Sequence, residues 1–228
     1  MLFRWLWRKL VIRLNKGEKP DVLEVNSGTW KDDLLGYIQR NEKIPKIVGG
    51  RYNCTEVKQA LKAESYSKCM YCESKVSHVS YEHIEHIKPK AKTKFPELTF
   101  EWENLGLACP VCNMNKSDEY DNELPILNPY TDSPEEFLLA AGPYIYARPG
   151  KPRGKLTEQL LGLNRIDLVE QRIERVETIR RLVDNYMNER NETLKKLLLK
   201  EVVQELKQDK PYSFVINSLI NIIGIEVA

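Results

Sequence analysis

The last third of the sequence carries the most regular hydrophobic pattern in the chain. From Asn164 onward, apolar residues recur at steps of three and four, with charged residues between them. This spacing predicts an amphipathic helix of about twenty residues. The residues on its apolar stripe are Ile166, Val169, Ile173, Val176, Ile179, Val183 and Tyr186.

Two further helices are predicted after this one. Residues 209–224 are largely apolar and predict a last, mostly buried helix, and Pro211 suits its first turn because a backbone N–H has no helical partner there. We interpret all three helices as a packing layer. The middle helix of the three, between the one after Asn164 and the one over 209–224, is predicted by a second apolar stripe. That stripe runs through Leu194, Leu197, Leu198, Val202 and Leu206.

Shorter elements are predicted in the first part of the chain. Residues 17–29 are rich in Gly, Pro, Asp and Ser, which is typical of a loop. Thr29 can then cap a helix over 30–41, and Thr55 can cap another over 56–65.

The middle of the chain is predicted to be compact and rich in turns. Residues 69–121 hold most of the cysteines and all the histidines. Beyond them, Ser133, Pro134 and Glu136 predict a helix start, because a capping serine, a first-turn proline and a glutamate follow in order. Residues 142–155 predict a short strand and a turn.

The first fourteen residues, MLFRWLWRKLVIRL, are apolar and basic. Their uncharged runs are too short to span a bilayer, and no small-residue cleavage site of a signal peptide follows. A buried strand, a partner-binding element and a membrane-surface helix are all compatible with this composition. We therefore expect no membrane insertion and a cytoplasmic location.

Composition narrows the class of protein only slightly. Charged residues make up 30% of the 228 and hydrophobic residues 42%, as in ordinary soluble domains, and the net charge of +2 indicates no particular partner. Two local segments are strongly basic: 86–94 has four lysines and no acid, and 146–155 has four basic residues and no acid. Either could bind phosphate or be a solvated loop.

Four of the five cysteines form two C-x-x-C pairs, at Cys69 and Cys72 and at Cys109 and Cys112. In a cytosolic chain such pairs typically hold metal, and four thiolates around tetrahedral zinc leave no open position, so we predict a structural zinc site. A redox dithiol and an iron–sulfur cluster are the alternatives. Cys54 stands apart and is predicted to be a buried thiol.

The segment between the cysteine pairs contains a second set of chemically active residues. It reads EHIKP at 85–89, WENLGLAC at 102–109 and CNMNK at 112–116. These elements resemble the signature of the HNH, or ββα-metal, endonucleases. Of the two Glu-His pairs, only Glu85-His86 has a proline three places after the histidine, so His83 is predicted to be a strand or supporting residue and His78 an exposed one.

The resemblance implies a role for each matching residue. His86 would deprotonate the attacking water, as a neutral imidazole can at cellular pH. Glu85 and Asn113 would supply oxygen ligands to Mg²⁺ or Mn²⁺. Asn104 would tie down the loop that orients the base, and Lys116, one turn from Asn113, would stabilise the phosphate. The family often has histidine where Asn113 stands, and asparagine is a weaker ligand.

Nucleic-acid contacts are predicted for the lysine run that follows His86. Lys88, Lys90, Lys92 and Lys94 would hold the backbone without reading sequence. Because neighbouring residues of a strand point to opposite faces, Glu85 and His86 must lie at a strand end or bend to reach one site.

A narrower resemblance covers residues 15–180. There the chain is similar to HNH nucleases of bacterial anti-phage systems of the Septu type, and to nucleases associated with retrons. Members of that group work beside an ATPase of the ABC or SMC-like kind. The resemblance therefore implies an ATPase partner, bound by the C-terminal helices or by the aromatic N-terminus.

We therefore expect an α+β fold that is mainly helical, with a ββα-metal core and a four-cysteine structural zinc site. Residues 1–66 would form an N-terminal helical, partner-facing segment, 67–124 the nuclease core and 125–228 a C-terminal helical region packed on it. The expected activity is metal-dependent hydrolysis of DNA or, alternatively, RNA, which leaves a 5′-phosphate and a 3′-hydroxyl. A zinc-stabilised binding module without catalysis and a membrane-associated effector are the competing hypotheses.

Overall fold

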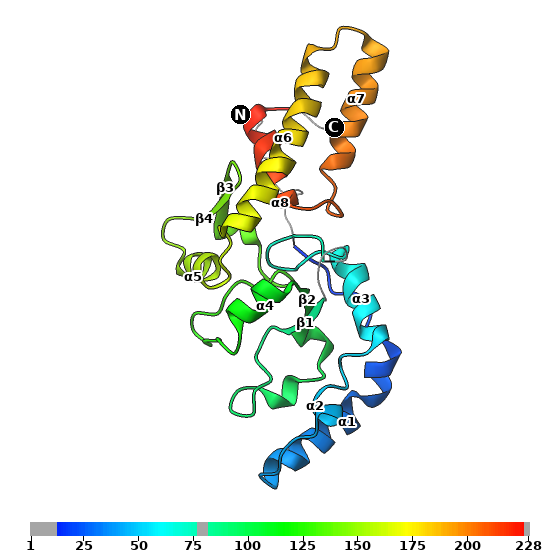
Figure 1. Cartoon of the computed structure of the whole chain (residues 1–228), viewed down its shortest axis with the longest axis vertical. Helices are drawn as coiled ribbons and strands as arrows, with labels where there is room; N and C mark the ends of the chain where they lie inside the picture. The colour runs from blue at the N-terminus through cyan, green and yellow to red at the C-terminus, as the bar shows by residue number, and fades with distance from the viewer. Residues whose placement is uncertain (1–12, 77–81, 226–228) are drawn as a thin grey trace, which may run out of the picture.

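The structure is a computed structural model that describes residues 13–76 and 82–225. Figure 1 shows a small ββα unit near the middle of the molecule, with α1 and α2 on one side and the long α6–α7 hairpin projecting on the other. The predicted 1–14 segment and His78 lie almost entirely outside the described residues. The expected fold class, mainly helical with small sheets, is confirmed.

The central unit is an antiparallel hairpin followed by a short helix. Strand β1 (His83–His86) pairs with β2 (Leu105–Ala108) so that His83 faces Ala108 and His86 faces Leu105. Helix α4 (Pro110–Lys116) follows β2 directly and contacts β1. Two 3-10 turns, η2 (Pro96–Leu98) and η3 (Trp102–Asn104), shape the connection between the strands.

Close packing against β2 explains its glycine. A Cβ atom at Gly106 would overlap the sulfur of Met70, which lies in the loop between the first two cysteines. The backbone N–H of Met70 donates to the carbonyl of Leu107 at 2.8 Å, so this loop runs directly beside the strand. Only a residue without a side chain leaves room for that approach.

Among the described residues before the hairpin, the helices are α1 (Asp21–Gln39), α2 (Lys46–Gly49) and α3 (Thr55–Ser65). The predicted helix at 56–65 is confirmed. The prediction of a loop over 17–29 was wrong from Asp21 onward, and Thr29 lies inside α1 instead of capping it. Pro20 begins that helix, Asp21 and Glu24 suit the positive end of its dipole, and Leu23 becomes fully buried.

A second hairpin replaces the helix predicted after Ser133. The start signal yields only one 3-10 turn, η4 (Pro134–Glu136), because the next residues pair as β3 (Leu138–Ala141) with β4 (Tyr144–Ala147). Gly142 adopts a φ of +58° in the tight turn between them. The predicted strand in 142–155 is thus confirmed, but its turn ends where α5 (Pro152–Leu160) begins.

The three predicted C-terminal helices are present as α6 (Ile166–Asn188), α7 (Glu192–Glu205) and α8 (Ser213–Ile223). The predicted stripe of α6 is confirmed at Val169, Ile179 and Val183, and it differs in the first half of the helix. Leu168, Val169, Arg172, Ile179 and Val183 are buried, whereas Ile166 and Ile173 are exposed.

The main hydrophobic cluster draws on all three predicted segments. It includes Leu23 from α1, Leu107 from β2, Leu168 from α6 and Val215 from α8. A smaller cluster joins α6, α7 and α8. The ββα unit therefore shares one hydrophobic cluster with helices that precede it and helices that follow it. Within the described residues, no helix combines the length and apolar character that crossing a bilayer needs.

Candidate active site and metal centre

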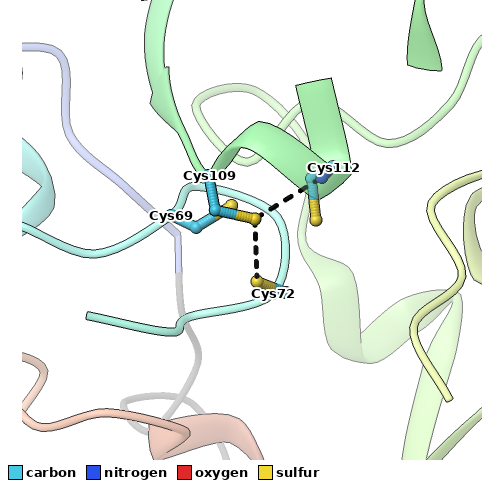
Figure 2. A group of neighbouring side chains, drawn as sticks. All are labelled: Cys69, Cys72, Cys109 and Cys112. Carbon is cyan, nitrogen blue, oxygen red and sulfur yellow. Dashed lines mark hydrogen bonds between the residues drawn. The ribbon is translucent and has the colours of Figure 1, made fainter. Parts of the chain in front are cut away.

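The two C-x-x-C pairs converge on one buried point. Ligand atoms from all four cysteines lie within 4.8 Å of one another, and all four residues are buried. The first pair lies in a loop closed by a bridge between Lys68 and Lys75, and Cys109 precedes α4 and accepts a hydrogen bond from the N–H of Cys112 at 3.4 Å. Figure 2 shows the four side chains facing a common centre.

The spacing of these sulfurs fits zinc. A tetrahedral ion with bonds of about 2.3 Å to sulfur requires sulfurs about 3.8 Å apart. The Sγ atoms of Cys72 and Cys109 are 3.8 Å apart. With four thiolates and no open position, such a centre would support the fold and leave catalysis to other residues.

Arg165, just before α6, lies against the outside of the cysteine cluster. Its guanidinium is 3.8 Å from the sulfurs of Cys72 and Cys112 and 4.0 Å from that of Cys109. Burial opposes the charge of Arg165, but the neighbouring thiolates raise its pKa overall. Zinc with four thiolates would carry two negative charges, so a cation here suits the loaded centre.

A buried polar cluster connects the same cysteine loop to α8. Glu73 pairs with Lys68 at 3.1 Å and accepts hydrogen bonds from the hydroxyl of Ser213 and the N–H of Phe214. Ser213 and Phe214 are the first two residues of α8, so Glu73 accepts hydrogen bonds from groups at the start of that helix, where backbone N–H groups have no helical partner. The cysteine loop and the C-terminal helices are therefore held together by charge as well as by apolar packing.

On the other side of the ββα unit lies a polar cavity of about 520 Å³. Its wall includes His83, Glu85 and His86 from β1 and Asn113 from α4. The strand ends at His86, so the expectation that the Glu85-His86 pair lies at a strand end holds. All four residues of β1 line this cavity, the Glu85-His86 pair among them.

His86 is held as a neutral imidazole. Its Nε2 atom lies 3.0 Å from the carbonyl oxygen of Thr99, which can only accept, so Nε2 carries the proton and Nδ1 has the free lone pair. Burial lowers the pKa of His86 to about 3. An uncharged imidazole with an unprotonated nitrogen can accept a proton from water.

Glu85 is buried in an ion pair with Lys116. The ammonium lies 2.7 Å from its Oε1 atom, and the hydroxyl of Tyr71 is 3.4 Å from the same oxygen. Burial raises the pKa of Glu85, and the charge of Lys116 opposes that shift. Glu85 is also one of the residues that line the cavity, and its carboxylate offers the oxygen that a hard cation prefers.

The structure corrects the role expected of Lys116. Its side chain is 1% exposed, and its ammonium also donates to the backbone carbonyl of His86 at 2.8 Å. It does not line the cavity. In this arrangement Lys116 neutralises Glu85 and fixes the end of β1 instead of contacting a phosphate.

Asn104 occupies the place that the expected loop-holding role requires. Its side-chain oxygen accepts from the N–H of Lys88 at 2.7 Å, and its amide nitrogen donates to the carbonyls of Lys88 and Leu98. The N–H of Ile87 also donates to the Asn104 carbonyl. These bonds close the loop that leaves β1 directly after His86.

His83 contacts the candidate metal ligand Asn113. The amide nitrogen of Asn113 lies 3.0 Å from Nδ1 of His83. Because that nitrogen can only donate, Oδ1 remains the atom with which Asn113 can bind an ion. The sequence pattern placed His83 outside the motif, and the only available signal was its position three residues before His86.

The predicted lysine patch is divided by the structure. Of the four, only Lys90 lines the cavity. The ammonium of Lys88 lies over the rings of Phe95 and Tyr120, and that of Lys92 donates to Asn41. Lys94 is exposed on the same loop.

The second basic segment, 146–155, does not contribute to the cavity wall. Arg153 forms an ion pair with Asp132 at 2.6 Å, and Lys155 pairs with Glu158. Arg148 donates to backbone carbonyls of Glu135 and Leu138. These side chains connect parts of the fold to one another.

Comparison with known proteins agrees with this geometry. Residues 69–119 match the family model described as HNH endonuclease. The chain is 32% identical over 169 residues to a Septu protein PtuB of Bacillus thuringiensis, and 28% identical over 198 residues to a Septu protein PtuB of Bacillus mycoides.

The matches cover 69% and 71% of this chain, and 64% and 66% of the two relatives, so the chain spans just under two thirds of their length. They confirm the resemblance expected from the motifs. The four-cysteine cluster lies on the matched segment, which also supplies His86, Asn104, Asn113 and most of the residues that line the polar cavity. Residues 69–119 are thus similar to an HNH endonuclease domain, in a chain similar to the Septu protein PtuB.

Proposed function

We propose that this protein is a metal-dependent endonuclease that hydrolyses phosphodiester bonds in nucleic acid. One observation carries the proposal: a single polar cavity combines an uncharged, fixed His86 with the oxygen donors Glu85 and Asn113. Hydrolysis of a phosphodiester needs a base for the water and a cation near the phosphate. The HNH domain supports the same reading.

In the proposed reaction, Nδ1 of His86 accepts a proton from water, and the resulting hydroxide attacks phosphorus. The bond to the 3′-oxygen breaks, and that oxygen takes a proton from solvent, which leaves a 5′-phosphate and a 3′-hydroxyl. Thr99 keeps His86 in the required tautomer, and Asn104 holds the loop behind it. Lys90, at the cavity wall, is placed to attract the substrate backbone.

A divalent cation, Mg²⁺ or Mn²⁺, would stabilise the negative charge that develops on the phosphate. Glu85 and Asn113 would hold it, because both line the cavity and both offer oxygen. One carboxylate and one amide suit such an ion, since Mg²⁺ commonly keeps several waters and binds the substrate phosphate as well.

We further propose that the nuclease acts in bacterial anti-phage defence with an ABC or SMC-like ATPase partner. This rests on the similarity to Septu proteins and on what that resemblance implies. Duplex DNA is the proposed substrate, with structured RNA as the alternative, and the cytoplasm the proposed location. The partner surface would be the C-terminal helices or the aromatic N-terminus.

A cleavage assay on purified protein with Mg²⁺ or Mn²⁺, on plasmid DNA and total tRNA in parallel, tests the activity. His86→Ala should lower the rate by about 10²- to 10⁴-fold, as loss of a general base does. Circular dichroism and zinc content should stay as in the wild type. Equal cutting by both proteins would refute His86 as the base. If neither cuts, the assay is repeated with the candidate ATPase.

A binding module without catalysis is the second candidate, and one observation favours it. Lys116 already neutralises Glu85, as a bound cation otherwise would. In that case the protein would bind nucleic acid with equal affinity with and without Mg²⁺, and His86→Ala would change no biological effect.

A further inference from the structure

The cavity has a wall that the HNH segment does not supply. Tyr52, Asn53 and Lys58 line it together with the residues of β1 and α4. They belong to the turn between α2 and α3 and to α3 itself, outside the matched residues 69–119. The N-terminal helices therefore complete the site as well as covering the core.

Tyr52 contacts His86 directly. The two ring centroids are 4.6 Å apart and the ring planes meet at 90°, the edge-to-face arrangement that aromatic rings prefer. The hydrogen bond from Nε2 of His86 to the carbonyl of Thr99 fixes one nitrogen of the imidazole. The ring can still turn about the axis of that hydrogen bond. Contact with the tyrosine ring restricts that rotation and therefore sets the direction of Nδ1.

Tyr52 is itself held in place. Its ring packs against the hydrophobic cluster of Leu34, Val48 and Phe100. The turn that carries it is closed by the N–H of Asn53 donating to the carbonyl of Gly50 at 2.9 Å. The ammonium of Lys90 lies 5.8 Å from the centre of the same ring. One side chain thus contacts both the candidate base and the lysine at the cavity wall.

We propose that Tyr52 is a positioning residue that holds the imidazole of His86 in the orientation in which Nδ1 faces the attacking water. It acts through His86 and contacts no reacting atom. The proposal rests on the nuclease function proposed above. It assigns to the turn between α2 and α3 a role in the active site, in addition to the partner-facing role expected of residues 1–66.

The test compares Tyr52→Phe and Tyr52→Leu in the full chain. Tyr37→Leu is the matched control, because Tyr37 packs against the same cluster and does not line the cavity. Phenylalanine keeps the ring contact, so Tyr52→Phe should retain kcat within about threefold. Tyr52→Leu should lower kcat by about 10- to 100-fold, as misplacement of a catalytic group does, with a smaller change in KM. Tyr37→Leu should leave kcat unchanged.

A second readout does not depend on cleavage. The chain has three histidines, so the ring C–H signals of His86 can be assigned in NMR spectra by comparison with His86→Ala. The ring current of Tyr52 should shift them, and the shift should persist in Tyr52→Phe and Tyr37→Leu and vanish in Tyr52→Leu. Unchanged His86 signals in Tyr52→Leu would overturn the proposal, as would a full kcat in that variant. If the wild type fails to cut any substrate, the nuclease function fails, and the NMR comparison still decides whether the ring of Tyr52 contacts His86, without which the proposal falls.

Discussion

The four-cysteine cluster and the polar cavity both use residues of helix α4, but their surroundings differ. Cys112 points into the closed cysteine cluster, and Asn113, its neighbour on the helix, lines the open cavity. The cysteine cluster is buried and surrounded by groups that connect it to other elements, such as Arg165. The cavity is polar and lined by side chains that can meet solvent.

This difference indicates a division of tasks. Substitutions at the cysteine cluster should lower stability first and activity as a consequence. Substitutions in the cavity should lower activity and leave stability nearly unchanged. The pair of Glu85 and Lys116 lies between the two regions, because Glu85 is a residue of the cavity wall whereas Lys116 is buried and does not line the cavity.

The largest effect is expected at the metal centre. Removing zinc with a chelator, or the change Cys109→Ser, should unfold the ββα unit, because structural zinc contributes on the order of 10 kcal/mol to such small units. Circular dichroism and zinc content measure this. Cys54→Ser is the matched control, since Cys54 lies outside the cluster. If the protein kept its melting temperature after treatment with the chelator, the cysteine cluster would not have the stabilising role proposed here.

The next largest effect is expected at the buried ion pair. Lys116→Met leaves Glu85 buried without its cation, which should cost about 3–5 kcal/mol of unfolding free energy in urea titrations. Combining it with Glu85→Gln should recover much of this loss. The control Lys155→Met breaks an exposed pair with Glu158 and should cost less than about 1 kcal/mol. Equal losses in the two lysine variants would contradict the role given to Lys116.

A moderate effect is expected at Arg165. Arg165→Gln should weaken zinc binding by about 10- to 100-fold, as loss of an outer-shell partner commonly does, because the charge of the thiolates is no longer offset. Competition with a chromophoric chelator measures this. Arg180→Gln, on the exposed face of α6, is the control and should bind zinc as the wild type does. Equal zinc affinity in Arg165→Gln and Arg180→Gln would show that Arg165 does not support the cysteine cluster.

The smallest effect is expected at the cavity rim. Lys90→Ala should weaken nucleic-acid binding a few-fold and reduce the slope of log K against log salt by about one, as loss of one phosphate contact does. Lys92→Ala, whose ammonium is held by Asn41, should leave the slope unchanged. Fluorescence anisotropy at several salt concentrations, in the His86→Ala background, separates binding from cutting. If Lys92→Ala changed the salt slope more than Lys90→Ala, the substrate would lie along the loop that carries Lys92 and not at the cavity.

The sequence by itself determined the features that depend on short spacing. The two C-x-x-C pairs indicated one metal centre, and the EHIKP, WENL and CNMNK elements indicated an HNH core. Apolar residues at steps of three and four indicated α6, α7 and α8. Each of these signals lies within a few turns of the chain, where local geometry decides which side chains share a face. The four-cysteine cluster and the place of His86 at the end of β1 could be predicted for this reason.

Only the tertiary structure decided which distant residues meet. The contact of Tyr52 with His86, the pairing of Lys116 with Glu85 and the approach of Arg165 to the cysteines join residues far apart in the chain. No local pattern marks them, because such contacts depend on how the helices pack around the hairpin. The same packing buried Lys116, which the motif alone had placed at the phosphate. Motif spacing therefore identified the chemistry, and packing determined which side chains can reach the substrate.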